Sequence, residues 1–110
     1  MNKNLDTAFA ALTDPTRRTI VQLLSGRPHR AGELHEAFPI SNPAISRHLR
    51  VLRESGVVEE RRIPEDARVR LYALRPEPLR EATAWLEEVG RVWQSALDSF
   101  KDYVEGGAET

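Results

Sequence analysis

The chain has 110 residues, of which 40% are hydrophobic and 30% charged, and it contains no cysteine. This length predicts one domain covering residues 1–110, and the missing thiols exclude disulfides and thiolate metal sites. The longest stretch without a charged residue is ten residues, Ala37–Ser46. Such a stretch is too short to span a bilayer, and the N-terminus does not resemble a signal peptide. We therefore expect a cytoplasmic protein that makes no membrane contact.

The net charge of −1 hides an uneven distribution of charge along the chain. Residues 1–40 carry a net +1, residues 41–75 carry +3 and residues 76–110 carry −5. Local charge, more than net charge, attracts nucleic acid. The middle segment is therefore the candidate for binding an anionic partner, and the acidic C-terminal segment is not.

The first third of the sequence predicts three short helices. A helix over about 4–13 is indicated by apolar residues at helical spacing, namely Leu5, Ala8, Phe9 and Leu12. Asp14 is a good N-cap and Pro15 a good first residue, so we expect a second helix over about 15–25. A third helix is expected over about 32–38, where the following proline closes it.

The most informative segment predicts a fourth helix over about 42–55, with both ends marked. Ser41 can cap its N-terminus with the hydroxyl, and Gly56 can take the left-handed conformation that ends a helix. One face is apolar and carries Ile45, Leu49 and Leu52. The opposite face offers hydrogen-bonding groups suited to bases and phosphates, from Asn42, Ser46, Arg47 and Arg50. The short turn before it predicts a helix-turn-helix, although this segment alone also fits an ordinary amphipathic surface helix.

After this helix the pattern changes to that of two strands, over about 57–63 and 68–74. In the second strand an apolar set alternates with a polar one, Val69, Leu71 and Ala73 against Arg68, Arg70 and Tyr72. This alternation predicts a half-buried strand. The hairpin would form a wing over about 57–74, beside the fourth helix, that exposes several arginines, namely Arg68, Arg70 and either Arg61 or Arg62.

The C-terminal third predicts one long helix over about 76–104. Its apolar residues alternate at spacings of three and four and form a heptad seam of Leu79, Ala82, Leu86, Val89, Trp93, Ala96, Phe100 and Tyr103. A helix of that length spans about 43 Å and would overhang so small a domain. The seam could pack on its own domain, but its overhang favours a second copy of the chain as the partner.

The whole pattern resembles the ArsR-type (arsenic-repressor-like) winged helix-turn-helix transcriptional regulators. The residues that carry the resemblance are the Ala-Leu-Thr-Asp-Pro-Thr-Arg-Arg stretch of 11–18, the Gly-Glu-Leu of 32–34, and the Ala-Ile-Ser-Arg-His-Leu-Arg-Val-Leu-Arg-Glu-Ser-Gly of 44–56. The resemblance implies a mainly α-helical winged fold with a small β-hairpin and a homodimer built on the first and last helices. It also implies repression of a promoter until a signal releases the protein.

The sequence departs from the metal-sensing members of that family. One family site places two cysteines on the third helix, where this chain has His35 and Ala37. A second family site uses histidines on the last helix, and no histidine follows His48 here. His29 and His35 with nearby carboxylates fall short of the three or four converging ligands that zinc needs. We therefore expect no metal and no other cofactor, and the effector stays unknown.

The leading hypothesis is a dimeric repressor bound to a two-fold-symmetric operator in double-stranded DNA. The expected DNA contacts come from the fourth helix and the wing, at Ser41, Asn42, Pro43, Ser46, Arg47, His48, Arg50, Arg61, Arg62, Arg68 and Arg70. His48 could contact phosphate or pack between helices. The expected dimer interface comprises Leu5, Phe9, Leu79, Leu86, Val89, Trp93, Ala96, Phe100 and Tyr103.

Two alternatives to that hypothesis are a winged-helix protein-interaction module that does not read DNA, and a metal-responsive repressor with an unrecognised site. The clustered arginines argue against the interaction module. An enzyme is disfavoured because the sequence has no cysteine nucleophile, no nucleophile elbow and no phosphate-binding glycine loop. Operator sequence, target genes and the sense of regulation cannot be read from these residues.

Overall fold

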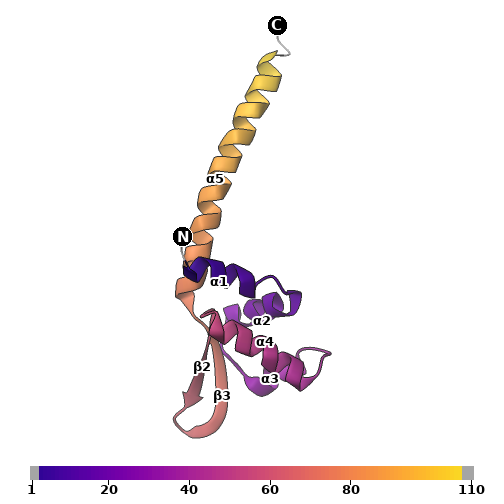
Figure 1. The fold of residues 1–110 in the computed structure, drawn as a ribbon, viewed down its shortest axis with the longest axis vertical. Helices are drawn as coiled ribbons and strands as arrows, with labels where there is room; N and C mark the ends of the chain where they lie inside the picture. Colours follow the sequence, from indigo (N-terminus) through magenta and orange to yellow (C-terminus); the bar gives the residue numbers. More distant parts are fainter. Residues whose placement is uncertain (1–2, 108–110) are drawn as a thin grey trace.

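The computed structural model describes residues 3–107, which form five helices and one small sheet (Figure 1). In chain order the elements are α1 (Lys3–Ala11), α2 (Pro15–Gly26), β1 (His29–Arg30), α3 (Ala31–Glu36), α4 (Asn42–Glu54), β2 (Val58–Ile63), β3 (Asp66–Leu74) and α5 (Pro76–Gly107). The first four helices gather into a body, the β2–β3 hairpin projects from it, and α5 extends away on the other side (Figure 1). The long axis of the molecule is therefore 73 Å, against 29 and 22 Å across.

The helix ends follow the capping signals in the sequence. The Asp14 carboxylate accepts a hydrogen bond from the Arg17 backbone N–H at 3.0 Å, and the Ser41 hydroxyl accepts one from Ala44 N–H at 3.3 Å. Both contacts satisfy backbone donors that a helix start otherwise leaves unpaired. Gly56 ends α4 with a φ of 81°, as expected of a left-handed cap. Local sequence thus sets both ends of α4.

The core lies where α4 meets the other helices and the base of the hairpin. Its largest fully buried side chains are Ile20, Leu34, Ile45, Leu49, Leu52, Val57 and Val58. The three apolar residues expected on the inner face of α4 are among them, so that expectation is confirmed. Fully burying such aliphatic side chains contributes about 1.5–3 kcal/mol each, which anchors α4 by one face and leaves the other open.

The sheet has a third strand that the sequence did not predict. The two-residue β1 pairs with β3, His29 opposite Tyr72 and Arg30 opposite Leu71, so the strand order is β1–β3–β2. A strand of two residues has no periodicity to detect, and it forms only because the long-range partner β3 is in place. The sequence predicted a hairpin alone, and the structure corrects this to a three-stranded antiparallel sheet.

Several element boundaries also differ from the expectation. Helix α1 ends at Ala11 and α3 at Glu36, each about two residues early, and β3 already begins at Asp66. The alternation expected for β3 placed Tyr72 on the exposed face together with Arg68 and Arg70. This is wrong for Tyr72, which is only 3% exposed. The base of the hairpin belongs to the core, so both faces are covered there, whereas the distal part is exposed.

Helix α5 packs on the body only through its first turns. The rings of Phe9 and Trp85 meet edge to face, 5.6 Å apart, at the contact between α1 and α5. Every residue from Thr83 to Gly106 is exposed, and the helix continues to Gly107, three residues beyond the expected end. Within residues 3–107, the structure contains no helix with the length and apolarity needed to cross a bilayer.

Candidate nucleic-acid interface

One face of α4 is open to solvent and polar. Asn42, Pro43, Ser46, Arg47 and Arg50 are all exposed on it, as the sequence predicted for a DNA-reading face. Within the part of the chain that the structure describes, no ion pair or hydrogen bond occupies the guanidinium of Arg47 or Arg50. Their donors are therefore available for base edges or phosphate oxygens, which a guanidinium can bind with two parallel hydrogen bonds.

Ser41 and His48 lie at the margin of this face and already have partners. The Ser41 oxygen is the N-cap acceptor, while its hydroxyl proton stays available for donation. The His48 side chain is 22% exposed, with Nδ1 3.4 Å from Arg17 Nη1 and 3.8 Å from an Asp14 oxygen. Of its two expected roles, these contacts support helix packing between α4 and the start of α2.

Asp14 links the same junction electrostatically. Its pKa is lowered chiefly by the hydrogen bond from the Arg17 backbone, with smaller contributions from the charges of His48 and Arg17. Arg17 also donates from Nε to the Ala11 carbonyl at 2.6 Å. Sequence reasoning missed this role of Arg17, because nothing in the local pattern shows that its side chain turns back across the α1–α2 turn.

Three of the four expected wing arginines are paired with carboxylates. The pairs are Arg61 with Glu59 at 2.5 Å, Arg62 with Glu60 at 3.2 Å and Arg68 with Asp66 at 3.1 Å. Both Arg61 and Arg62 are exposed, where the sequence left one or the other open. The Arg61–Glu59 and Arg68–Asp66 pairs are exposed and contribute only about 0–1 kcal/mol each, so an incoming phosphate can replace the carboxylate there. Arg70, for which no partner is found between residues 3 and 107, needs no such exchange.

Glu60 differs from the other wing carboxylates, because it also contacts α4. Its Oε2 accepts a hydrogen bond from Arg53 Nη1 at 2.7 Å, and its side chain is only 15% exposed. Sequence analysis did not single out this residue. A glutamate in a run of charged strand residues gives no local signal that it faces the end of a helix.

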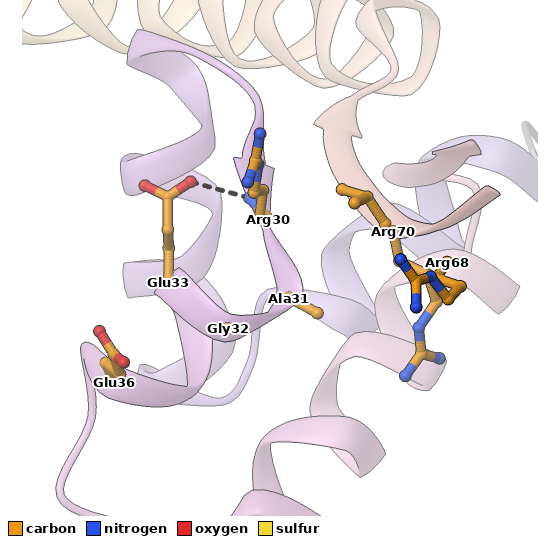
Figure 2. Close-up of a pocket in the computed structure, with 8 residues that line it drawn as sticks. Arg30, Ala31, Gly32, Glu33, Glu36, Arg68 and Arg70 are labelled. Atoms are coloured by element: carbon orange, nitrogen blue, oxygen red, sulfur yellow. Dashed lines mark hydrogen bonds between the residues drawn. The ribbon is translucent and has the colours of Figure 1, made fainter. Parts of the chain in front are cut away.

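A pocket of about 440 Å³ lies between α3 and the wing strand β3 (Figure 2). Arg68 and Arg70 extend from the strand on one side, and Glu33 and Glu36 lie on the helix side (Figure 2). Glu33 accepts a hydrogen bond from the Arg30 backbone at 3.0 Å and pairs with Arg27 at 2.7 Å. The Arg27 contact is the main reason that the pKa of Glu33 falls to about 2. The two walls thus carry opposite charges.

The histidines considered as metal ligands do not converge. His29 Nδ1 lies 2.9 Å from the Arg27 carbonyl, at the edge strand β1. His35 lies on α3, and its buried Nδ1 has no hydrogen-bond partner among the residues that the structure describes. Across residues 3–107, no group of three or more His, Asp or Glu side chains is arranged to hold a metal ion.

The candidate self-association surface is the apolar face of α5. Its large side chains are widely exposed, including Trp93 at 64%, Phe100 at 66% and Tyr103 at 79%. Leu86 and Val89 are also exposed, as is Ala96, whereas Leu5, Phe9 and Leu79 are half-buried where α1 and the core meet α5. Monomeric proteins rarely expose a continuous apolar patch of this length, so the face indicates a binding surface.

Comparison with known proteins identifies this combination of helix-turn-helix and wing. Residues 14–60 match the family model described as bacterial regulatory protein, arsR family. The HTH-type transcriptional regulator Rv2034 of Mycobacterium tuberculosis is 38% identical over 100 residues, covering 91% of this chain and 88% of the relative. The transcriptional repressor SdpR of Bacillus subtilis is 35% identical over 82 residues, covering 74% and 88%.

The fold is also found among solved structures. The crystal structure of the ArsR family transcriptional regulator RHA00566 is 34% identical and superimposes with a TM-score of 0.72. The match covers 83% of this chain and 97% of that one. The overall fold is therefore shared with a regulator of known structure.

Proposed function

Since the chain belongs to the ArsR family of bacterial regulatory proteins, we propose that it acts as a homodimeric repressor on a two-fold-symmetric operator. The family and the named relatives make it a DNA-binding transcriptional regulator and not an enzyme. The proposal adds the dimer, the symmetry of the operator, the residues that contact DNA and the sense of regulation. It also assigns the protein to the cytoplasm, where it meets the chromosome, and treats residues 1–110 as one domain.

The open face of α4 is the observation that carries the proposal. The helix is buried along Ile45, Leu49 and Leu52, and on its far side Arg47 and Arg50 have no partner among residues 3–107. It can therefore enter a major groove without disturbing the core. Asn42, Pro43 and Ser46 lie nearest the N-terminal end, which reads base edges in this docking geometry. Arg61, Arg62, Arg68 and Arg70 would meet the phosphate backbone from the wing, with Ser41 and His48 at the edge of the same surface.

The apolar face of α5 supports the dimer. The 32-residue helix is about 48 Å long, and its residues from Thr83 to Gly106 are all exposed in the single chain. A second copy presents the same face, so the two can cover one another in a self-complementary interface. Two recognition helices held about 34 Å apart would then engage successive major grooves.

The release signal is proposed to be something other than a metal ion. The support is the lack of cysteine in the sequence and the separation of His29 from His35 on different elements. Thiolate ligands, which select soft metal ions, cannot be supplied by this chain. The nature of the signal is left open.

A footprint and a promoter reporter test the proposal together. Wild-type protein should protect a two-fold-symmetric site upstream of a gene that it controls and should lower expression from that promoter. The double variant Arg47→Ala/Arg50→Ala should lose both effects. Arg91→Ala removes an arginine that pairs with Glu88 on α5, far from α4, and serves as the matched control. The proposal would be contradicted if the Arg47→Ala/Arg50→Ala variant and the Arg91→Ala control protected and repressed the promoter equally. Protection of an asymmetric half-site alone would also contradict it.

A further inference from the structure

One carboxylate joins the recognition helix to the wing. Glu60 lies on β2, and its Oε2 accepts a hydrogen bond from Nη1 of Arg53 at 2.7 Å. Arg53 belongs to the last turn of α4. Its other oxygen, Oε1, lies 3.2 Å from Nη2 of Arg62, two residues farther along the same strand. Both oxygens are thus occupied, and the two cations come from two different elements.

In the described chain, the body meets the distal part of the wing at α3, which lies beside β3 across the pocket. Toward the tip from Leu71, β3 pairs with β2 alone, because β1 pairs only with Tyr72 and Leu71. The hairpin from Arg61 to Arg70 is therefore held chiefly by its own ladder and projects from the body (Figure 1). Its covalent link to α4 passes through Gly56, the residue with positive φ. The contact between Glu60 and Arg53 joins strand and helix near this link, where it can influence the angle between them.

The same carboxylate also decides which wing arginine stays free. Arg62 and Arg70 are directly opposite on β2 and β3, so their side chains share one face. Like charges in that position repel. Glu60 neutralises Arg62, which offsets the repulsion and leaves Arg70 as the unpaired cation of the face.

We propose that Glu60 is a positioning residue, which fixes the angle between wing and recognition helix and so couples phosphate contact to base reading. The inference rests on the proposed function, since it concerns how the same DNA surface gains specificity. The partly buried carboxylate, shared by two guanidinium groups, is more than an exposed pair of the kind that contributes little. In the free protein it also offsets the positive charges of Arg53 and Arg62, which weakens their attraction for DNA of any sequence.

The wing angle can be measured without DNA. The chain has no cysteine, so cysteines introduced at Gln22 on α2 and Glu65 in the wing turn, both exposed, would be the only sites for spin labels. Labelled protein is diluted with unlabelled protein so that each distance reports one chain. Pulsed electron paramagnetic resonance should give a narrow distance distribution for the parent and for Glu59→Gln, whose carboxylate pairs only within the wing. Glu60→Gln should broaden the distance distribution.

Binding to DNA supplies a second readout, in which affinity for random duplex should rise while preference for operator falls. Glu60→Gln should bind random duplex more tightly than wild type, with a log K against log salt slope steeper by about 0.9 for each freed arginine that reaches a phosphate. The preference for operator over random duplex should fall on the order of tenfold, equivalent to about 1.4 kcal/mol. A merely structural role would weaken binding to both DNAs. Glu59→Gln should keep the wild-type preference.

A second variant protects the test against misfolding. Arg53→Met removes the helix partner from a side chain that is 40% exposed, and it should broaden the same distance distribution. If both Arg53→Met and Glu60→Gln keep the narrow distribution, Glu60 does not position the wing and the inference is overturned. A wild-type protein that ignores every promoter fragment would contradict the proposed function instead, and the distance measurement would still decide the inference.

Discussion

Phe9 of α1 and Trp85 of α5 meet edge to face, with their ring centroids 5.6 Å apart. This contact lies where α5 leaves the body, since every residue from Thr83 to Gly106 is exposed. The helix that supports proposed dimerisation is thus attached to its own domain at one end only. Changes farther along α5 should leave the fold of the body intact, which allows assembly and folding to be separated by experiment.

Trp93→Ala should dissociate the dimer without unfolding the chain. Trp93 is 64% exposed in a single chain, so its burial depends on the partner. Removing a packed tryptophan costs about 3–5 kcal/mol, enough to shift a dimer toward monomer at micromolar concentration. Sedimentation velocity should show this shift, circular dichroism should stay unchanged, and operator affinity should fall. Arg91→Ala, on the opposite side of α5, should remain dimeric. A wild-type protein that sediments as a monomer would refute the interface.

Arg47→Ala should weaken operator binding by about 1–3 kcal/mol if the guanidinium reads a base. Its exposed position and lack of a described partner motivate this expectation. Fluorescence anisotropy on operator and on random duplex gives the measurement, and the loss should be larger on operator. An equal loss on both would reassign Arg47 to a phosphate.

Replacing Arg68 and Arg70 by alanine should weaken binding almost evenly across DNA sequences. Each lost phosphate contact lowers the magnitude of the log K against log salt slope by about 1. Arg70 has no described carboxylate partner, whereas Arg68 pairs with Asp66. Arg70→Ala alone should therefore weaken DNA binding more than Arg68→Ala alone. Titrations at several salt concentrations would reveal an unchanged slope if the wing stays clear of the backbone.

Metal ions should not release the protein from DNA. The motivation is the missing cysteine and the lack of a converging ligand group among residues 3–107. A gel shift with zinc, cadmium, nickel and arsenite at low micromolar concentration should leave the complex intact. Reversible release that disappears in His35→Ala would establish a metal-responsive repressor in place of the mechanism proposed here.

Glu33 should make the stability of the folded chain depend on pH in the acidic range. Its pKa falls from 4.5 to about 2 in the folded chain, chiefly through Arg27 and next through the Arg30 backbone. A lowered folded-state pKa adds stability above the unfolded value, and this contribution is lost as pH falls from about 4.5 through 2. The difference in melting temperature between wild type and Glu33→Gln should therefore shrink across that window.

The sequence predicted the parts of the site that depend on local signals. Ser41 and Gly56 mark the ends of α4, and the seam of Ile45, Leu49 and Leu52 points its open face outward. These features depend only on capping chemistry and helical periodicity, so they can be predicted without knowledge of the tertiary fold. The exposed face of α5 followed from its heptad pattern in the same way.

The missed features all depend on contacts between distant segments. Strand β1 exists because β3 pairs with it, and Tyr72 is buried because the base of the hairpin closes the core. The contacts of His48 with Arg17, 31 residues away, and of Glu60 with Arg53, across a turn, leave no periodic trace. Local patterns show which residues are charged and exposed, but not which of them neutralise one another.

Strand β2 lies at the edge of its sheet, with Glu59, Glu60, Arg61 and Arg62 in succession. An edge strand offers unpaired backbone groups to any other extended chain and is a common starting point for aggregation. Four consecutive charged side chains make such strand addition costly, because an added strand would have to desolvate them. The wing that we propose to contact DNA can therefore project from the body uncovered without recruiting other strands.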